Sequence, residues 1–340
     1  GCGCLVEAGV DLPATVANEL VFIEVADTLT ALGDLASLHL ESLDTEIIGI
    51  TGSNGKTTTK DMVATVLAHF GSVSSTHGNF NNLIGLPLTA LQVTPSDDYA
   101  VFEMGMNVPG EIARLAKIAR PKVGVITSIA AAHLAGLGTV DAIREEKASL
   151  YRALDESGVA VVNARDPQVL QAAKETRAQL LTVGAAGTDI CLEGIRRIGV
   201  GALGARLTYQ GRGYPIRLRG LGVHNLWNAA MAVGVAVALG LDAEQAVAAL
   251  ADYRGPAGRL NWVPAAKGLN LIDDTYNANP ESARAALRTL VELADSSKTV
   301  AVLGDMLELG ESASVLHQEV GEYAADIGVD VLLAQGQFAA

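Results

Sequence analysis

A glycine-rich turn followed by lysine and threonine is the stretch of this sequence best suited to chemistry. Residues 46–60 read EIIGITGSNGKTTTK: an apolar run, a turn and the start of a helix. Gly52 and Gly55 carry no Cβ, so the backbone can curl until several N–H groups point at one anion. Lys56 can reach the outer phosphates of a nucleotide, and the Thr57 hydroxyl can bind the accompanying magnesium ion. The turn therefore predicts a nucleoside triphosphate site.

The turn does not meet the strict phosphate-loop pattern G-x-x-x-x-G-K-[ST], because Ile50 stands at the first glycine position. It matches the shorter pattern T-G-x-N-G-K-T. A flexible surface turn is the alternative, but Lys and Thr in this order between an apolar strand and a helix argue against it. The helix N-terminus after Lys56 would add partial positive charge and free N–H groups.

Two further polar side chains follow apolar runs that are typical of strands. Glu103 ends the run in YAVFEMG, and a carboxylate there could bind magnesium directly or through water. A helix-capping or solvent-facing acid explains Glu103 equally well. His133 ends ITSIAAAH, just past another strand. A single histidine is more often structural than a ligand, so its position alone makes it a candidate.

Two polar clusters lie beside predicted helices. The stretch IDDTYNANP crowds a strand end before a helix that starts with proline, with Asp273, Asp274, Tyr276, Asn277 and Asn279. Capping explains one or two of these residues but not all of them. The stretch GNFNNLIGLP places amides where they can hold a ligand or form turns, at Asn79, Asn81 and Asn82.

Two cations are ambiguous on local grounds. Lys147 lies in DAIREEKASL, where acidic and basic neighbours are typical of a solvated helix face. Arg259 follows two glycines in GPAGRL, which resembles a linker. It is either a surface charge or a clamp for a phosphate, which a planar guanidinium suits.

The elements that must position these groups alternate between strand and helix from Glu46 onward. This alternation predicts an α/β fold with a mostly parallel sheet covered on both faces. Ligands of such sheets bind beyond the carboxyl ends of the strands. The predicted strands are 47–51, 72–75, 99–104, 123–128, 159–163 and 180–183. The helix-like segments between them include 57–70, 110–119 and 140–154.

Three parts are predicted along the chain. Residues 1–45 hold too little apolar sequence to bury a core and indicate the remnant of an N-terminal domain. Residues 46–262 form the central nucleotide-binding domain, and residues 263–340 form a Rossmann-like C-terminal domain that is incomplete. The first part is predicted to contain a strand at 20–25 and a helix at 28–40 capped by Asp27 or Thr28. The second ends in a small antiparallel meander at 188–221 and helices at 225–239 and 243–253. The third has strands at 269–273, 300–303 and 329–333, and helices at 280–294 and 312–327.

Composition excludes several classes of protein. A formal net charge of −14 argues against a general nucleic-acid binder, which needs a basic face. The most apolar run, 229–241, is short of the roughly 20 residues of a membrane span and indicates a buried helix. Cys2, Cys4 and Cys191 make neither a disulfide framework nor a zinc site, so free thiols in a reducing, cytoplasmic setting are expected. The chain start lacks the basic region of a signal peptide.

Taken together, these segments resemble the Mur ligase family of ATP-dependent amide-forming enzymes. The similar segments span almost the whole chain: VFIEVADTLTALGDLA, ITGSNGKTTTK, GNFNNLIGLPLT, FEMGMNVPGEI, VGVITSIAAAHL, EEKASL, GVHNLWNAAMA, GPAGRL, LIDDTYNANPES and VLGDMLELG. The phosphate turn marks the whole superfamily, which includes folylpolyglutamate synthases. DDTYNANP and GDMLELG are similar to the members that join D-alanyl-D-alanine to UDP-N-acetylmuramoyl-tripeptide.

The resemblance implies a role for each candidate residue. ATP would be bound by Gly52, Ser53, Asn54, Gly55, Lys56, Thr57, Thr58, Asn228, Arg259, Asp274, Tyr276 and Asn277. Two magnesium ions would be bound by Thr57, Glu103, His133 and Lys147. Lys147 corresponds to a carbamylated lysine of the family, and it would be catalytic together with Lys56 and His133. The UDP-linked substrate would lie against Asn79, Asn81 and Asn82.

The implied reaction forms an amide through an acyl phosphate, with a monomeric enzyme in the cytoplasm. Compared with the family pattern, most of the N-terminal domain and the distal half of the C-terminal domain are missing from this sequence. Two alternatives stay open: a sibling ligase that adds another amino acid, and a non-catalytic nucleotide-binding protein.

Overall fold

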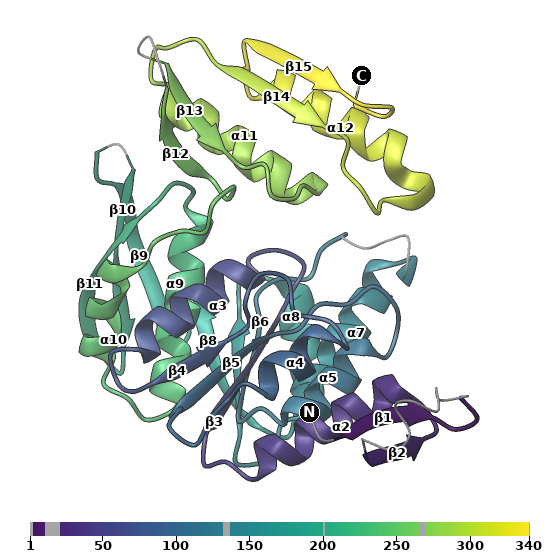
Figure 1. The fold of residues 1–340 in the computed structure, drawn as a ribbon. Helices are drawn as coiled ribbons and strands as arrows, with labels where there is room; N and C mark the ends of the chain where they lie inside the picture. The colour runs from purple at the N-terminus through teal and green to yellow at the C-terminus, as the bar shows by residue number, and fades with distance from the viewer. Residues whose placement is uncertain (1–2, 11–20, 132–136, 200, 266–268, 340) are drawn as a thin grey trace.

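The computed structural model describes residues 3–10, 21–131, 137–199, 201–265 and 269–339. Figure 1 shows a small N-terminal piece, a large central sheet wrapped by helices, and a C-terminal unit that faces the central part. Within these described residues, no helix is both long and apolar enough to cross a membrane.

The central sheet has nine strands. They are β3 (Glu46–Thr51), β4 (Val73–Ser75), β5 (Tyr99–Glu103), β6 (Val123–Ile126), β7 (Val159–Asn163), β8 (Gln179–Gly184), β9 (Ile190–Arg197), β10 (Ala202–Tyr209) and β11 (Arg212–Arg219). In space the order is β11-β10-β9-β8-β7-β6-β3-β5-β4. Strands β3 to β8 pair in parallel, which confirms the predicted sheet. The predicted meander is present as β9 to β11, and it extends the same sheet because β9 pairs in parallel with β8.

Helices cover both faces of this sheet (Figure 1). One face carries α3 (Lys56–Leu67), α9 (His224–Ala238), α10 (Ala243–Ala249) and the short η2 (Leu250–Asp252). The other carries α2 (Thr28–Glu41), α4 (Gly85–Ala90), α5 (Glu111–Ala119), α7 (Val140–Arg152), α8 (Pro167–Ala172) and η1 (Ala173–Glu175). Helix α9 is rich in Ala and Val, packs against α3 and is buried along most of its length, so the predicted buried helix is confirmed. Each face holds an apolar core, and the two cores fix the strand ends that carry the polar groups.

The N-terminal residues lie against the central part. Strand β1 (Gly3–Glu7), which the sequence did not predict, pairs in parallel with the predicted β2 (Val21–Val25). Asp27 caps α2 by accepting a hydrogen bond from the backbone of Thr30. Helix α2 packs on α4 and α5 and contributes Ala36 and Leu40 to the core of the central domain. These residues therefore add to a core that belongs to another part of the chain.

The C-terminal unit packs helices α11 (Pro280–Ala294) and α12 (Ala313–Asp326) beside two small sheets. Strands β14 (Val300–Gly304) and β15 (Val331–Gln335) pair in parallel, and the short η4 (Gly310–Ser312) precedes α12. Strand β13 (Asn270–Asp273) was predicted, but its partner β12 (Asn261–Pro264) was not. The two pair antiparallel across a short connection, the pairing that needs the least intervening chain. Strand β12 crosses the boundary predicted between residues 262 and 263, and the three-part division of the chain stays a prediction.

Candidate functional site

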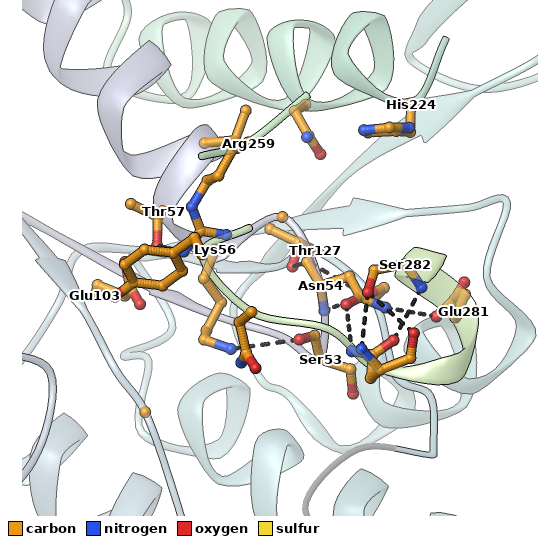
Figure 2. A pocket seen from close by; sticks show the side chains of 18 of the residues that line it. Ser53, Asn54, Lys56, Thr57, Glu103, Thr127, His224, Arg259, Glu281 and Ser282 are labelled. Atoms are coloured by element: carbon orange, nitrogen blue, oxygen red, sulfur yellow. Dashed lines mark hydrogen bonds between the residues drawn. The ribbon is translucent and has the colours of Figure 1, made fainter. Parts of the chain in front are cut away.

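A cavity of about 550 Å³ lies where the carboxyl ends of the central strands face the C-terminal unit. Polar side chains from segments far apart in the sequence line it (Figure 2). Its walls include the phosphate turn, Glu103, Arg259, the segment 276–279 and the loop 307–309. The cavity therefore gathers most of the groups that the sequence singled out.

The phosphate turn has the conformation that its glycines predict. Gly55 is the N-cap of α3 and has a φ of 80°, a left-handed conformation that suits glycine. The strand end β6 holds the turn in place. The backbone N–H of Asn54 donates to Ser128 Oγ at 3.0 Å, and its carbonyl accepts from Thr127 Oγ1 at 2.5 Å. The turn is thus shaped before any ligand arrives, which favours anion binding at the start of α3.

Lys56 curls back over the turn that it follows. Its Nζ donates to the carbonyl of Gly52 at 2.7 Å. Burial lowers the pKa of Lys56, and the nearby Glu103 carboxylate opposes this shift. A phosphate group in the turn would offer this ammonium a stronger, charged partner than a carbonyl oxygen.

Glu103 ends β5 with one carboxylate oxygen held and the other unpaired. Its side chain is 2% exposed, and Oε1 accepts from Asn81 Nδ2 at 2.8 Å. Oε2 is buried and has no hydrogen-bond partner among the described residues. Leaving such an oxygen unpaired destabilises the fold by about 1–3 kcal/mol or more. Because Glu103 lines the same cavity as Thr57, this oxygen and the Thr57 hydroxyl form a donor set that fits a hard divalent cation such as magnesium.

Arg259 joins the linker after the central domain to the phosphate turn. Its Nη2 donates to Thr57 Oγ1 at 3.1 Å, and its guanidinium lies 4.2 Å from the centre of the Tyr276 ring. Asp274 Oδ1 accepts from the backbone N–H of Leu260 at 3.0 Å. Burial raises the pKa of Asp274. The two sequence clusters GPAGRL and DDTYNANP are therefore one structural unit beside the phosphate site.

The side chain of Asn54 bonds to the first turn of α11. Its Nδ2 donates to Glu281 Oε2 at 2.8 Å, and its Oδ1 accepts from Asn279 Nδ2 at 2.6 Å (Figure 2). Asn279 also caps α11 through a reciprocal pair of bonds with Ser282. Asn277 lines the cavity nearby. The sequence did not single out Glu281, since an acid in the first turn of a helix normally needs no partner.

Lys147 is buried directly behind the cavity wall. It is 1% exposed, and its Nζ lies 3.8 Å from Sδ of Met106, which lines the cavity. The adjacent Glu146 carboxylate is occupied, because it accepts from the backbone N–H groups of Gly110 at 2.8 Å and Ile112 at 2.7 Å. Burial and then the charge of Lys56 hold the pKa of Lys147 well below its ordinary value. Burial therefore favours the neutral amine form of this side chain over the ammonium.

The three asparagines of GNFNNLIGLP all line the cavity but have different partners. Asn82 Oδ1 accepts from the backbone N–H groups of Ile84 at 3.1 Å and Gly85 at 2.8 Å, at the start of α4. Asn81 bonds to Glu103, as described above. His133 lies outside the described residues.

Another part of the cavity holds Asn228, which the sequence analysis assigned to ATP binding, and three residues that it missed, Arg165, His224 and Trp227. The Arg165 guanidinium lies 4.1 Å from the centre of the Trp227 ring, and both line the cavity with His224 and Asn228. Burial lowers the pKa of His224 to about 4, so it is neutral. Asn228 Nδ2 donates to Asn225 Oδ1 at 3.4 Å. The segment GVHNLWNAAMA was available as a signal, but only Asn228 received a role from it.

Comparison with protein families identifies the whole arrangement. Residues 50–236 match the model of the Mur ligase middle domain, and residues 258–337 match the model described as Mur ligase, glutamate ligase domain. The chain belongs to the Mur ligase family. In this Mur ligase, the phosphate turn and Glu103 fall in the middle domain, whereas the segment 274–281 falls in the second match.

Individual relatives agree with this assignment. The chain is 37% identical to the UDP-N-acetylmuramoyl-tripeptide–D-alanyl-D-alanine ligase of Bacillus subtilis over 97% of this chain and 71% of that protein. It is 34% identical to the Escherichia coli ligase of the same name, over 96% of this chain and 71% of that protein. The crystal structure of MurF from Acinetobacter baumannii matches with a TM-score of 0.91 and 36% identity, over 100% of this chain and 73% of that one. MurF from Thermotoga maritima in complex with ADP matches with a TM-score of 0.86 and 29% identity, over 98% and 75% of the two chains.

Proposed function

We propose that this Mur ligase uses ATP to join D-alanyl-D-alanine to UDP-N-acetylmuramoyl-tripeptide, a step in the synthesis of peptidoglycan precursors. The observation that carries the proposal is the convergence of Lys56, Thr57, Glu103 and Arg259 on one cavity. The names of the relatives supply the two substrates. We further propose that the enzyme works as a monomer in the cytoplasm, where ATP is available.

The proposed reaction has two steps. A carboxylate oxygen of the tripeptide attacks the γ-phosphorus of ATP, which gives an acyl phosphate and ADP. The amine of D-alanyl-D-alanine then attacks the acyl carbon, loses a proton and displaces inorganic phosphate. In this scheme the amides of the turn, from Gly52 to Thr58, and the ammonium of Lys56 hold the triphosphate against the incoming acid.

The remaining nucleotide contacts would come from both walls of the cavity. Arg259 would clamp a phosphate, and its hydrogen bond to Thr57 supports this role. Asn228, Asp274, Tyr276 and Asn277 would surround the rest of ATP. The UDP-linked substrate would lie against the segment that carries Asn79, Asn81 and Asn82.

Two magnesium ions would fit the proposed site. Thr57 and the unpaired Oε2 of Glu103 would hold one of them, and His133 with a carbamylated Lys147 would hold the second. The ions would neutralise the charge that the triphosphate and the carboxylate bring together. A neutral amine can capture carbon dioxide, and burial shifts the pKa of Lys147 in the direction that favours the neutral amine.

The test uses the full-length protein with ATP, magnesium and both proposed substrates. We expect release of phosphate that depends on both the tripeptide and the dipeptide, and an acyl phosphate that hydroxylamine traps when the dipeptide is omitted. Lys147→Ala should abolish the trapped product, whereas Lys174→Ala, at an exposed position, should not. Nucleotide binding without any trapped product would favour a non-catalytic protein, and turnover with a different amine would favour a sibling ligase.

A further inference from the structure

A second buried lysine lies on α3, one turn beyond Lys56. Lys60 is 5% exposed and does not line the cavity. Its Nζ donates to the carbonyl of Thr76 at 2.9 Å and forms an ion pair with Asp61 Oδ1 at 2.5 Å. A buried ammonium is expensive unless several partners satisfy it, and an apolar residue of similar length would fill the same space at less cost. The mechanism above gives this charge no task.

Thr76 connects Lys60 to the strand that ends at Glu103. It is 1% exposed and follows the last residue of β4. While its carbonyl accepts from Lys60, its Oγ1 accepts from the backbone N–H of Glu103 at 3.0 Å. Its own N–H donates to the carbonyl of Val101 at 3.0 Å, so all three polar groups of Thr76 are fixed.

A second route reaches the same carboxylate from the chain that follows Thr76. Asn81 donates to Glu103 Oε1 at 2.8 Å, and its backbone carbonyl accepts from the N–H of Gly105 at 2.7 Å. The backbone of Glu103 and one of its oxygens are therefore both held. Oε2 is left buried and without a partner among the described residues. This arrangement leaves a single carboxylate oxygen of a cavity-lining residue without a partner in the part of the chain that the structure describes.

We propose that Lys60 is a positioning residue for the cation site at Glu103 and that it acts through Thr76. The Lys60 ammonium holds the Thr76 carbonyl, and the Thr76 hydroxyl holds the Glu103 backbone. Because α3 carries both Lys60 and Thr57, these bonds keep the distance between the two predicted cation ligands, Thr57 and Glu103, constant. This inference rests on the proposed function, since the cation is the one that accompanies ATP. The competing explanation is an ion pair that only anchors α3 to the sheet.

The experiment measures binding of Mn²⁺ by electron paramagnetic resonance, with a non-hydrolysable ATP analogue present. The variants are Lys60→Met, Thr76→Val and Thr76→Ser, and Lys122→Met is the matched control. Lys122 forms an ion pair with Glu46, at the start of β3 and thus at the opposite edge of the sheet. We expect Lys60→Met and Thr76→Val to weaken Mn²⁺ binding about tenfold, a usual effect of changing a residue that orients a metal ligand. Thr76→Ser keeps the hydroxyl and should bind Mn²⁺ like the wild type.

Affinity for the analogue in excess chelator separates positioning from general damage. The proposal predicts that this metal-free affinity is unchanged in every variant. If Lys60→Met lowers the affinity for the analogue equally with and without metal, and also lowers the melting temperature, Lys60 only supports the fold. The two Thr76 variants test the proposal even if Lys60→Met does not fold. Equal Mn²⁺ binding by Thr76→Val and Thr76→Ser would overturn it.

Glu103→Gln distinguishes failure of this inference from failure of the proposed function. If Glu103→Gln leaves Mn²⁺ binding unchanged, the proposed metal site itself is wrong. If Glu103→Gln abolishes Mn²⁺ binding but Lys60→Met and Thr76→Val do not weaken it, the proposed metal site is supported and the positioning role of Lys60 is wrong.

Discussion

Replacing Lys147 by methionine should change how the stability of the protein depends on pH. Burial holds the pKa of Lys147 well below the 10.5 of a free lysine, so folding must deprotonate this amine at any pH between the two values. Because the folded state then binds one proton fewer than the unfolded state, the free energy of unfolding rises with pH by about 1.4 kcal/mol per unit. The gain ends as pH passes the unfolded pKa of about 10.4.

The size of the effect follows from this slope. At pH values between the lowered folded pKa and the unfolded pKa, the titration of Lys147 should add about 1.4 kcal/mol per pH unit to the free energy of unfolding of the wild type. Lys147→Met lacks this contribution and places a similar volume of apolar side chain beside Met106. The stability of the wild type relative to the variant should therefore rise with pH up to about pH 10.4, by about 1.4 kcal/mol per unit above the folded pKa.

Urea unfolding at several pH values measures this difference. The buffers must be free of carbon dioxide, because a carbamate on the folded amine would stabilise the native state by mass action. Lys174→Met, at an exposed position on η1, is the control and should show no such trend. A difference between Lys147→Met and wild type that does not vary with pH would mean that Lys147 is charged in the folded state, and the argument for a reactive amine would be refuted.

Three more substitutions test other contacts of the site and fold. Asn54→Ala removes the two side-chain bonds to α11 but keeps the backbone bonds of the turn. The interaction between the central sheet and the C-terminal unit should weaken by about 1–3 kcal/mol. Small-angle scattering should then report a larger radius of gyration, and an unchanged radius would contradict the role of this contact. Arg259→Lys loses the stacking on Tyr276 and the planar guanidinium that bonds to Thr57, so calorimetry should show ATP binding about tenfold weaker. Equal ATP affinity of the variant and the wild type would rule out a phosphate clamp. Tyr151→Phe removes the buried hydroxyl that donates to the Val161 carbonyl and accepts from the Ile126 amide, so urea titration should show about 1 kcal/mol less stability with ATP affinity intact.

Local sequence was enough to predict the phosphate turn and the fold around it. A buried strand, two glycines and a helix start are all encoded within residues 46–60, although the strand pairs with β5 and β6 and the turn is held by Thr127 and Ser128. The parallel sheet followed from the same alternation repeated along the chain. Strands β1 and β12 were missed because each is short and is defined by its pairing with β2 or β13 rather than by its own pattern.

The candidate site was predictable in position but not in its internal bonds. Glu103 was found because it ends an apolar strand, yet its environment depends on Thr76 and Asn81, which precede it by more than one element. Asn81 was expected to face the UDP-linked substrate, and in the structure its side-chain N–H is directed at the carboxylate instead. That expectation for the segment stays a prediction, because Asn79 and Asn82 also line the cavity.

The burial of residues 146 and 147 in the stretch EEK could not be predicted from the local sequence. Successive residues of a helix are rotated by about 100°, so three in a row can pass from solvent to core. Glu145 is on the surface beside Arg144 and Arg152, whereas Glu146 and Lys147 are buried. The bonds that make burial of Glu146 possible come from backbone N–H groups at the start of α5, more than 30 residues earlier in the chain. With the carboxylate bound by these N–H groups, desolvation lowers the pKa of the neighbouring Lys147 amine. The lowered pKa of Lys147 is therefore a consequence of how α7 packs on α5, which the local sequence of three charged residues does not show.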